Sequence, residues 1–138
     1  SCASSRSDMA APSLTLSILP GVYAICRLEP NSPLPDWASG SFFSITRAAE
    51  ELSVVCPQVN VPERVKHEGG WRCMKVEGPL ELSLIGILAS LTTALAQANI
   101  NVFAISTFDT DYLLVKEERL EEAVRALGET GHNVMREG

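Results

Sequence analysis

The clearest hydrophobic pattern in the chain predicts a helix in its second half. Leucine recurs at every third or fourth position of one stretch, at Leu84, Leu88, Leu91 and Leu95. This spacing places the four side chains on one face of an α-helix. A neighbouring stripe is also apolar, with Ile87, Ala94 and Ala98. The predicted helix is therefore apolar over much of its circumference, so one sheet face would not cover it fully.

Further patterns complete the second half. Glu118–Leu127 carries charges on one helical face and apolar residues on the other, and Gly128 follows where glycine commonly ends a helix. The expected strands are Trp71–Val76, Asn101–Thr107, Tyr112–Lys116 and His132–Met135. The order from the first of these strands to the last is thus β-α-β-β-α-β. This order is typical of the ferredoxin-like fold, an α+β architecture with two helices on one face of an antiparallel sheet.

The first half is rich in β-forming residues and poor in helical patterns. Leu14–Leu19 and Val22–Leu28 are separated only by Pro20-Gly21, which predicts a hairpin. Phe42–Arg47 and Leu52–Cys56 predict a second hairpin. The remaining segments are expected to be a proline-rich loop, Glu29–Gly40, and a polar linker that ends in Gly69-Gly70, Pro57–Gly70.

These elements predict two packed units in a chain of 138 residues, a length that fits one domain or two small ones. Residues 1–12 are expected to be a disordered tail or an expression remnant, with Met9 as the native start. Residues 13–70 would form a helix-poor N-terminal unit and residues 71–138 the C-terminal unit. The strand that begins at Trp71 could be shared or exchanged between them.

Composition narrows the range of partners. Hydrophobic residues make up 46% of the chain and charged residues 20%, which suits a folded core. The net charge of −6 repels phosphate backbones and anionic lipids, so we expect neither nucleic acid nor a membrane as a partner. Leu82–Phe108 carries no charged residue, but its Ser, Thr, Asn and Gln residues favour a buried helix and strand over a membrane span. The start of the sequence has no apolar run typical of a signal peptide.

The four cysteines are expected to be reduced core thiols in a cytoplasmic protein. Cys2, Cys26, Cys56 and Cys73 have irregular spacings without a C-x-x-C pair, and the last three lie in apolar runs. A disulfide framework would need an oxidising compartment, which neither the composition nor the start of the chain indicates.

The sequence lacks the motifs of common catalytic and cofactor sites. It contains no G-x-G-x-x-G, G-x-x-x-x-G-K-[ST], G-x-S-x-G or H-E-x-x-H. The two histidines, His67 and His132, have no cysteine or carboxylate at metal-ligand spacing. We therefore expect no enzyme activity, no cofactor and no metal. An enzyme that acts through Asp109 and Asp111 is the weakest alternative.

One segment, Ile105–Tyr112, combines polar groups with an aromatic ring between two apolar strands. It contains two acids, three hydroxyls and Phe108. Asp111 can pair with a ligand ammonium, and Phe108 can pack against an apolar stem. The helix that starts near Ser83 offers free N–H groups for a carboxylate, so the parts suit a zwitterion. On spacing alone, the plainer interpretation is a hairpin turn whose Asp and Thr residues cap its own backbone.

The runs Gly78–Thr92 and Ala98–Val115 resemble the ACT domain, in particular the CASTOR type found in the cellular arginine sensor and in small bacterial and fungal proteins. The first half is similar to the helix-poor ACT unit that precedes this domain, through Leu34–Trp37, Phe42–Thr46 and Glu51–Cys56. The resemblance covers nearly all of the sequence from Leu14 to Met135.

The resemblance implies a regulatory, non-enzymatic module that binds an amino acid where two tandem ACT units meet. Its ligand-binding positions correspond here to Gly86, Ile87, Leu88, Thr107, Phe108 and Asp111. Asp111 would hold the ligand ammonium or a side-chain donor, and the backbone of residues 86–88 would meet the carboxylate. Phe108 would shape the pocket and Thr107 would add a hydroxyl. Leu84 stands where the arginine sensor has an acidic residue, which favours a smaller or more apolar amino acid than arginine, or none.

The resemblance also implies a homodimer. The arginine sensor contains two such pairs of ACT units and this chain contains one, so two copies would place ligand sites near a two-fold axis. The Leu84–Leu95 helix or an ACT strand edge would form the contact, because the uncharged stretch needs more cover than one unit supplies. The alternative is a monomer whose two units cover each other. A regulatory protein would be a further partner, and the alternative function is a dimerisation or protein-interaction module that has lost its ligand.

Overall fold

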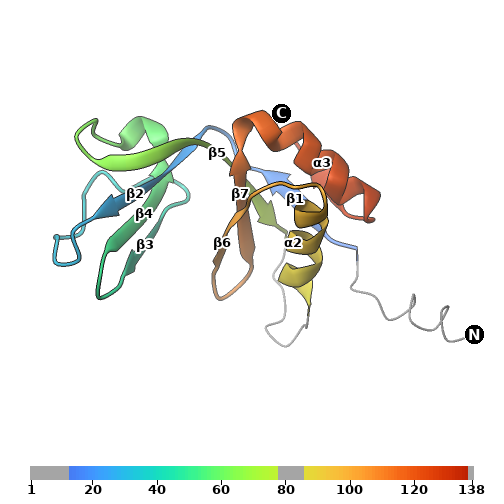
Figure 1. Cartoon of the computed structure of the whole chain (residues 1–138), viewed down its shortest axis with the longest axis horizontal. Helices are drawn as coiled ribbons and strands as arrows, with labels where there is room; N and C mark the ends of the chain where they lie inside the picture. Colours follow the sequence, from blue (N-terminus) through green and yellow to red (C-terminus); the bar gives the residue numbers. More distant parts are fainter. Residues whose placement is uncertain (1–12, 78–85, 137–138) are drawn as a thin grey trace, which may run out of the picture.

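A computed structural model describes residues 13–77 and 86–136. Two β-rich halves lie side by side, and both helices cover the C-terminal half (Figure 1). The predictions about residues 1–12, Cys2 and Leu84 lie outside the described residues. No helix within the two described ranges is long and apolar enough to cross a membrane.

The elements follow one another along the chain in this order. The N-terminal half contains β1 Thr15–Ile18, β2 Tyr23–Leu28, β3 Ser44–Arg47, β4 Leu52–Pro57 and the 3-10 turn η1 Gln58–Asn60. The long strand β5, Lys66–Val76, follows. The C-terminal half then contains α2 Ile87–Gln97, β6 Phe103–Ser106, β7 Asp111–Lys116, η2 Glu117–Arg119, α3 Leu120–Glu129 and β8 Asn133–Met135.

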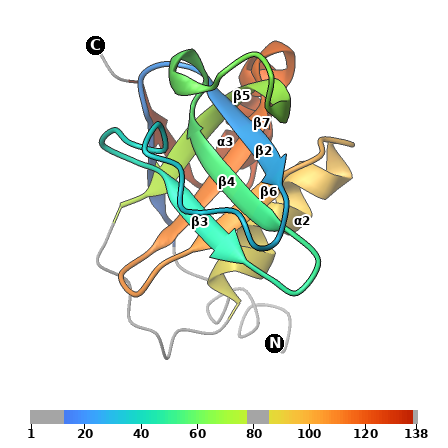
Figure 2. The ribbon, with the colours of Figure 1, turned by 90° about the vertical axis from the view of Figure 1, so that its left-hand side faces the viewer.

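Strand β5 belongs to both halves of the molecule. Its first residues pair with β2, which gives an N-terminal sheet in the order β3-β4-β2-β5. Its last residues pair with β1 on one side and β7 on the other, which gives a second sheet in the order β8-β1-β5-β7-β6. Figure 2 shows the N-terminal sheet in front of the strands of the C-terminal half.

The prediction of a first hairpin is wrong. Strands β1 and β2 do not pair with each other, because both run antiparallel to the same edge of β5, with Leu16 opposite Val76 and Tyr23 opposite Trp71. Pro20-Gly21 only interrupts this ladder, with Gly21 at φ 85°. A Pro-Gly break suits a turn and a bent strand equally well. The strand that decides between them is β5, which lies about fifty residues further along the chain.

The predicted linker Pro57–Gly70 is also wrong in its second part. Strand β5 already starts at Lys66, and Gly69-Gly70 lies within it. The register with β2 shifts here by one residue, as expected for a β-bulge. Gly70 has φ 78° and donates its N–H to Oε1 of Gln58 over 2.8 Å. The two glycines therefore bend β5 from one sheet into the other.

The α+β, ferredoxin-like class is confirmed in the C-terminal half. Elements β5, α2, β6, β7, α3 and β8 follow the expected β-α-β-β-α-β order, with both helices on one face. One strand is added to this arrangement, because β1 lies between β5 and β8 and runs parallel to β8. Residues 13–65, all of which are described, contain no α-helix. The N-terminal half is therefore helix-poor, as expected.

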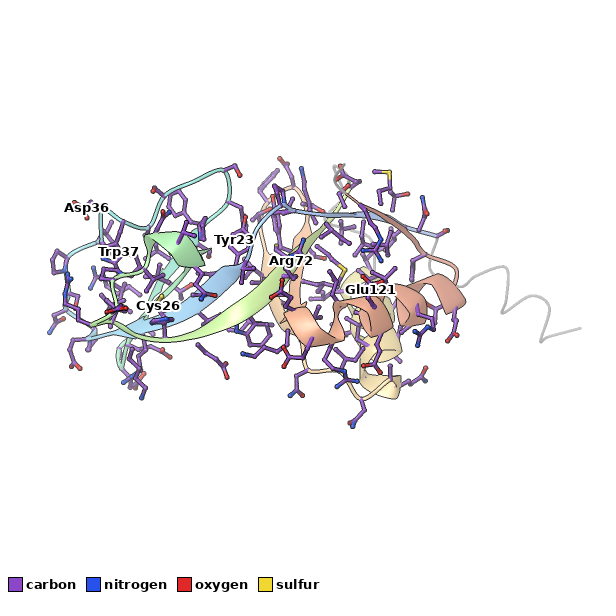
Figure 3. All side chains as sticks on the ribbon, turned by 90° about the horizontal axis from the view of Figure 1, so that it is seen from above. Tyr23, Cys26, Asp36, Trp37, Arg72 and Glu121 are labelled. Carbon is purple, nitrogen blue, oxygen red and sulfur yellow. The ribbon has the colours of Figure 1, made fainter. Side chains whose placement is uncertain are left out.

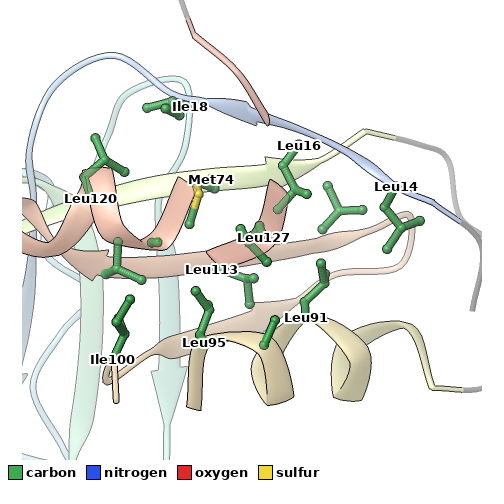
Figure 4. Packing of buried hydrophobic residues seen from close by; sticks show 14 of the residues in the cluster. Leu14, Leu16, Ile18, Met74, Leu91, Leu95, Ile100, Leu113, Leu120 and Leu127 are labelled. Atoms are coloured by element: carbon green, nitrogen blue, oxygen red, sulfur yellow. The ribbon is translucent and has the colours of Figure 1, made fainter. Parts of the chain in front are cut away.

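The helices pack on the sheet through the predicted leucine stripe. Leu91 and Leu95 of α2 are fully buried and point toward Leu113 and Leu127 (Figure 4). Leu88 is half-buried at the edge of the same cluster. The opposite face of α2 is exposed and carries only uncharged side chains, Ala89, Thr93, Ala96 and Gln97. One sheet thus covers only part of this helix.

A second core joins the two halves. Phe42, from the loop before β3, stacks on Tyr112 of β7 with ring centroids 4.1 Å apart. It also meets Tyr23 of β2 edge-on at 6.0 Å. Figure 3 shows Tyr23 near the junction of the halves. The expected strand Phe42–Arg47 begins two residues later, at Ser44, because Phe42 serves this contact instead.

The described cysteines are core residues, as expected. Cys26 and Cys56 pack under the Trp37 loop on the outer face of the N-terminal sheet, and Cys73 lies in the core between the halves. Burial raises the pKa of the Cys73 thiol to about 12. This thiol is therefore protonated and a poor nucleophile at neutral pH.

The His132 ring connects Leu14, the residue before β1, to helix α2. Its Nδ1 accepts the N–H of Leu14 over 3.1 Å, and its Nε2 lies 3.3 Å from Oγ of Ser90. An acceptor at Nδ1 requires the neutral ring with its hydrogen on Nε2. The side chain is buried, and burial lowers the pKa of His132 below its usual range.

We expect the protein to lose stability as pH falls through about 6.5, the ordinary pKa of a histidine. The unfolded chain protonates His132 near pH 6.5, whereas the folded chain binds that proton only at lower pH, so unfolding takes up a proton in between. The contribution of neutral His132 to the free energy of unfolding is thus complete well above pH 6.5 and declines below that pH. Urea unfolding at several pH values should show a smaller loss for His132→Gln than for the wild type. His67→Gln, which changes an exposed ring, is the control, and equal losses in all three proteins would contradict the prediction.

Gly69→Ala should lower the free energy of unfolding by about 1 kcal/mol, the size of one hydrogen bond. A Cβ at this position would lie 2.5 Å from Oε1 of Gln58, so the Gln58 amide must leave the N–H of Gly70. Gly128→Ala on α3 is the matched control, since its Cβ meets nothing within 4 Å. This second change should stabilise the protein by about 0.5–1 kcal/mol. Denaturant unfolding that gives both changes the same sign would contradict this account.

Candidate functional site

The start of helix α2 presents backbone N–H groups without a partner among the described residues. Gly86 precedes the helix in the left-handed conformation, at φ 83°, and its carbonyl accepts the N–H of Ser90 over 2.8 Å. No side chain of the described residues caps this end, and the first turn contains no acidic residue. The N–H groups of the first turn and the positive end of the helix dipole are therefore free to meet an anion.

Two of the predicted ligand residues contribute their backbone only. Ile87 is buried in the core under α2, and Leu88 packs against the same core. Their side chains point away from any ligand at the helix start. Gly86, Ile87 and Leu88 can therefore act only through the N–H groups and the open space that glycine leaves, since nothing lies within 4 Å of a Cβ at Gly86.

The β6–β7 turn holds itself together with its hydroxyls. The N–H of Thr107 donates to the carbonyl of Thr110 over 2.8 Å, and Oγ1 of Thr107 contacts both the carbonyl and the N–H of Thr110. This supports the plainer interpretation for Thr107, whose hydroxyl caps the turn.

Thr110 has a role that the sequence analysis missed. Its side chain is buried, and Oγ1 donates to the carbonyl of Val76 over 2.5 Å, at the end of β5. This bond fixes the turn beside the strand that leads toward α2. The turn and the start of α2 lie at the same end of the C-terminal sheet in Figures 1 and 2. The sequence Thr-Phe-Asp-Thr-Asp at residues 107–111 suggested a capped turn but could not indicate a partner in another strand.

Asp111 and Phe108 are the groups of this turn that remain available. Oδ1 of the half-buried Asp111 accepts a hydrogen bond from Oγ of Ser106 over 2.6 Å. Oδ2 has no partner among residues 13–77 and 86–136. Phe108 is 80% exposed at the tip of the turn. The structure thus brings Thr107, Phe108 and Asp111 together, but it does not enclose the Phe108 ring.

The arrangement suits binding of a zwitterion. The N–H groups at the start of α2 can donate hydrogen bonds to a carboxylate, while the Asp111 carboxylate at the same end of the sheet can accept hydrogen bonds from an ammonium. Within the part of the chain that the structure describes, no three His, Cys, Asp or Glu residues are placed to hold a metal ion.

Comparison with solved structures places the chain in a family. The crystal structure of the protein Atu0741 from Agobacterium tumefaciens matches with a TM-score of 0.88 and 40% sequence identity. The match covers 93% of this chain and 96% of the Agobacterium protein. The chain belongs to the same protein family as Atu0741.

Family comparisons divide this relative of Atu0741 into two parts. Residues 66–129 match the ACT domain family. Residues 21–64 match a family described as an N-terminal domain. The first range begins with β5 and ends with α3, and the second contains β2, β3 and β4. The predicted resemblance to ACT domains is confirmed, whereas the CASTOR type and its tandem units stay a prediction.

More distant structures share the fold of this Atu0741 relative. A Vibrio cholerae protein of unknown function has a TM-score of 0.71 at 22% identity, covering 86% of this chain and 91% of that one. The ligand-free regulatory subunit of aspartate kinase from Thermus thermophilus has a TM-score of 0.61 at 11% identity, covering 88% of this chain and 99% of the subunit. At these identities the likeness shows the fold alone. ACT domains are typical of regulatory modules that bind amino acids.

Proposed function

We propose that this protein is a non-enzymatic regulatory module that binds a small amino acid. The observation that carries the proposal is the pair of complementary groups at one end of the C-terminal sheet. The start of α2 offers N–H donors after Gly86, and the turn offers Oδ2 of Asp111, neither of which is bonded to a side chain in the described part of the chain. An amino acid would direct its carboxylate to the helix and its ammonium to Asp111.

The sequence limits the size and charge of the ligand. Leu84 is apolar, so no carboxylate stands two residues before Gly86 to pair with a guanidinium. Phe108 adds an exposed ring that can pack against an aliphatic or aromatic side chain. A small or apolar amino acid therefore suits the site better than arginine does.

A homodimer would complete this site. The exposed face of α2 carries Ala89, Thr93, Ala96 and Gln97, and the sequence has no charged residue from Leu82 to Phe108. A second copy packed on this face would bury small side chains without desolvating a charge. The contact would lie beside the start of α2, so the partner copy could also cover Phe108.

A cytoplasmic location and a regulatory protein partner belong to the same proposal. The buried, protonated Cys73 thiol suits a reducing compartment. A regulatory module without enzyme activity can act only by binding other molecules. A change in dimer geometry caused by the amino acid would therefore have to be recognised by another protein.

The second candidate is a dimerisation or interaction module that does not bind a ligand. The hydrogen bonds of Ser106, Thr107 and Thr110 favour it, because all three hydroxyls already serve the turn. Asp111 would then be a structural residue that accepts the Ser106 hydroxyl.

A thermal melt in the presence of each common amino acid at millimolar concentration tests the proposal. A ligand at about 100 times its Kd adds ~2.7 kcal/mol of stability, which is a shift of several degrees for a chain of this size.

Asp111→Ala should weaken binding by ~2–5 kcal/mol, since it removes one partner of a charge pair. Asp109→Ala, an exposed neighbour in the same turn, is the control and should bind normally. If no amino acid moves the melt of the wild type, the interaction module is the better account.

Light scattering with a charge placed on α2 tests the dimer. The wild type should give a dimer mass at micromolar concentration, and Thr93→Glu should give a monomer mass because it buries an unpaired carboxylate in the contact. Arg125→Glu, on the exposed face of α3, is the control and should remain dimeric. A monomeric wild type, or a dimer that tolerates Thr93→Glu, would rule out this contact.

A further inference from the structure

A row of polar side chains crosses the inner face of the N-terminal sheet. Its register joins Thr46 of β3 to Ser53 of β4, Ser53 to Arg27 of β2, and Arg27 to Lys66 of β5. Residues directly opposite each other in neighbouring strands point to the same side of the sheet. Two hydroxyls and two cations therefore stand side by side on one surface.

One of the two cations of this row, Lys66, has no ion pair among the described residues. Arg27 and Lys66 are direct cross-strand partners, and like charges in this position destabilise a sheet. Arg27 pairs with Glu51 over 3.3 Å and donates to the carbonyl of Glu50 over 3.1 Å, whereas Lys66 forms no ion pair with any residue in the ranges 13–77 and 86–136. An unpaired lysine opposite an arginine is unexpected in a chain with a net charge of −6.

The next row on the same face supplies an apolar surface. Val55 of β4 lies opposite Ile25 of β2, and Ile25 lies opposite Glu68 of β5. Glu68 is 3.8 Å from Lys116 of β7, so its charge is shared with a lysine outside the row. Val55 and Ile25 thus form an apolar patch beside the cations.

Both rows face a groove whose other wall belongs to the C-terminal half. Two adjoining cavities of about 290 and 520 Å³ lie here, and Thr46, Ser53 and Phe103 line both of them. Arg27 and Lys66 line the larger cavity together with two carboxylates, Glu51 and Glu68, whereas Val55 lines the smaller one. Glu51 is paired with Arg27 and Glu68 with Lys116, so Lys66 is the cation of this lining without an ion pair among the described residues. The hydroxyls of Thr46 and Ser53 have no hydrogen-bond partner within the described part of the chain. Donors, cations and an aromatic ring therefore converge on space large enough for a small molecule.

We propose that this groove binds a small organic carboxylate with an apolar body. Lys66 would hold the carboxylate by a charge-assisted hydrogen bond, with the hydroxyls of Ser53 and Thr46 as further donors. The apolar body would lie between Phe103 on one wall and Ile25 and Val55 on the other. The groove uses none of the six residues of the proposed amino-acid site, so it is a second site. The two sites are neighbours, because Ser106 lines the smaller cavity and donates to Asp111. Its ligand would touch both halves and bridge them.

Phenylacetate is a suitable probe, followed by two-dimensional NMR of the ¹⁵N-labelled protein. We expect saturable shifts of the backbone amides of Arg27, Ser53 and Phe103. The neutral analogue 2-phenylethanol should bind more weakly, because it keeps the ring and lacks the charge. The same titration with inorganic phosphate tests whether the polar row of Thr46, Ser53, Arg27 and Lys66 binds anions of any kind.

Lys66→Gln should weaken phenylacetate binding by about tenfold or more, the size of a lost hydrogen bond to a charged group. The same change should keep or raise the melting temperature, since it removes the like-charge pair. Lys75→Gln is the matched control, because Lys75 lies on β5 outside the groove and its loss should leave binding unchanged.

Three outcomes would overturn the proposal. The first is the absence of saturable shifts in the groove, and the second is equal affinity of wild type and Lys66→Gln for phenylacetate. The third is binding of phosphate without binding of phenylacetate, which would assign the row to a different ligand class. Shifts confined to residues 86–88 and 107–111 count as the first outcome, because they would place the probe at the amino-acid site.

Discussion

The continuous backbone ladder of β5 is the constraint on which the rest of the structure depends. Its first residues complete one sheet and its last residues complete the other, while β1 and β2 follow it along one edge. Buried backbone N–H and C=O groups need partners, so this ladder cannot be interrupted in the middle without leaving some of them unpaired. The bulge at Gly69-Gly70 lets β5 change direction between the two sheets while its backbone stays paired before and after the bulge. The stack of Phe42 on Tyr112 then fills the angle between the sheets.

The β6–β7 hairpin links this frame to both candidate sites. Its tip is fixed to the end of β5 by Thr110, and there it meets the end of the sheet where α2 starts. Its outer strand contributes Phe103 to the groove that faces the N-terminal sheet. The N-terminal half thus has a specific place in the architecture: it covers the sheet face that the two helices leave open.

Local patterns were sufficient for the elements but not for their partners. The leucine stripe and the Phe42–Cys56 hairpin follow from side-chain periodicity and short turns, so the sequence could predict them. The pairing of β1 with β5 joins Leu16 to Val76, and no local signal indicates such a distant partner. The same limit applies to the sites. Thr107, Phe108 and Asp111 are neighbours in sequence and could be predicted as a group, whereas the Arg27–Lys66 row exists only through the register of four strands.

The place of β1 between β5 and β8 also affects how the chain can be made. The first described strand pairs with Val76 in the middle of the sequence and with Asn133 near its end. Leu14 is further held by His132. During synthesis, an emerging β1 therefore has no partner on one edge until β5 has been made, and none on the other edge until β8 has been made. Such non-local closure is slow compared with local helix formation, and an unpaired strand is open to association with other chains in the meantime.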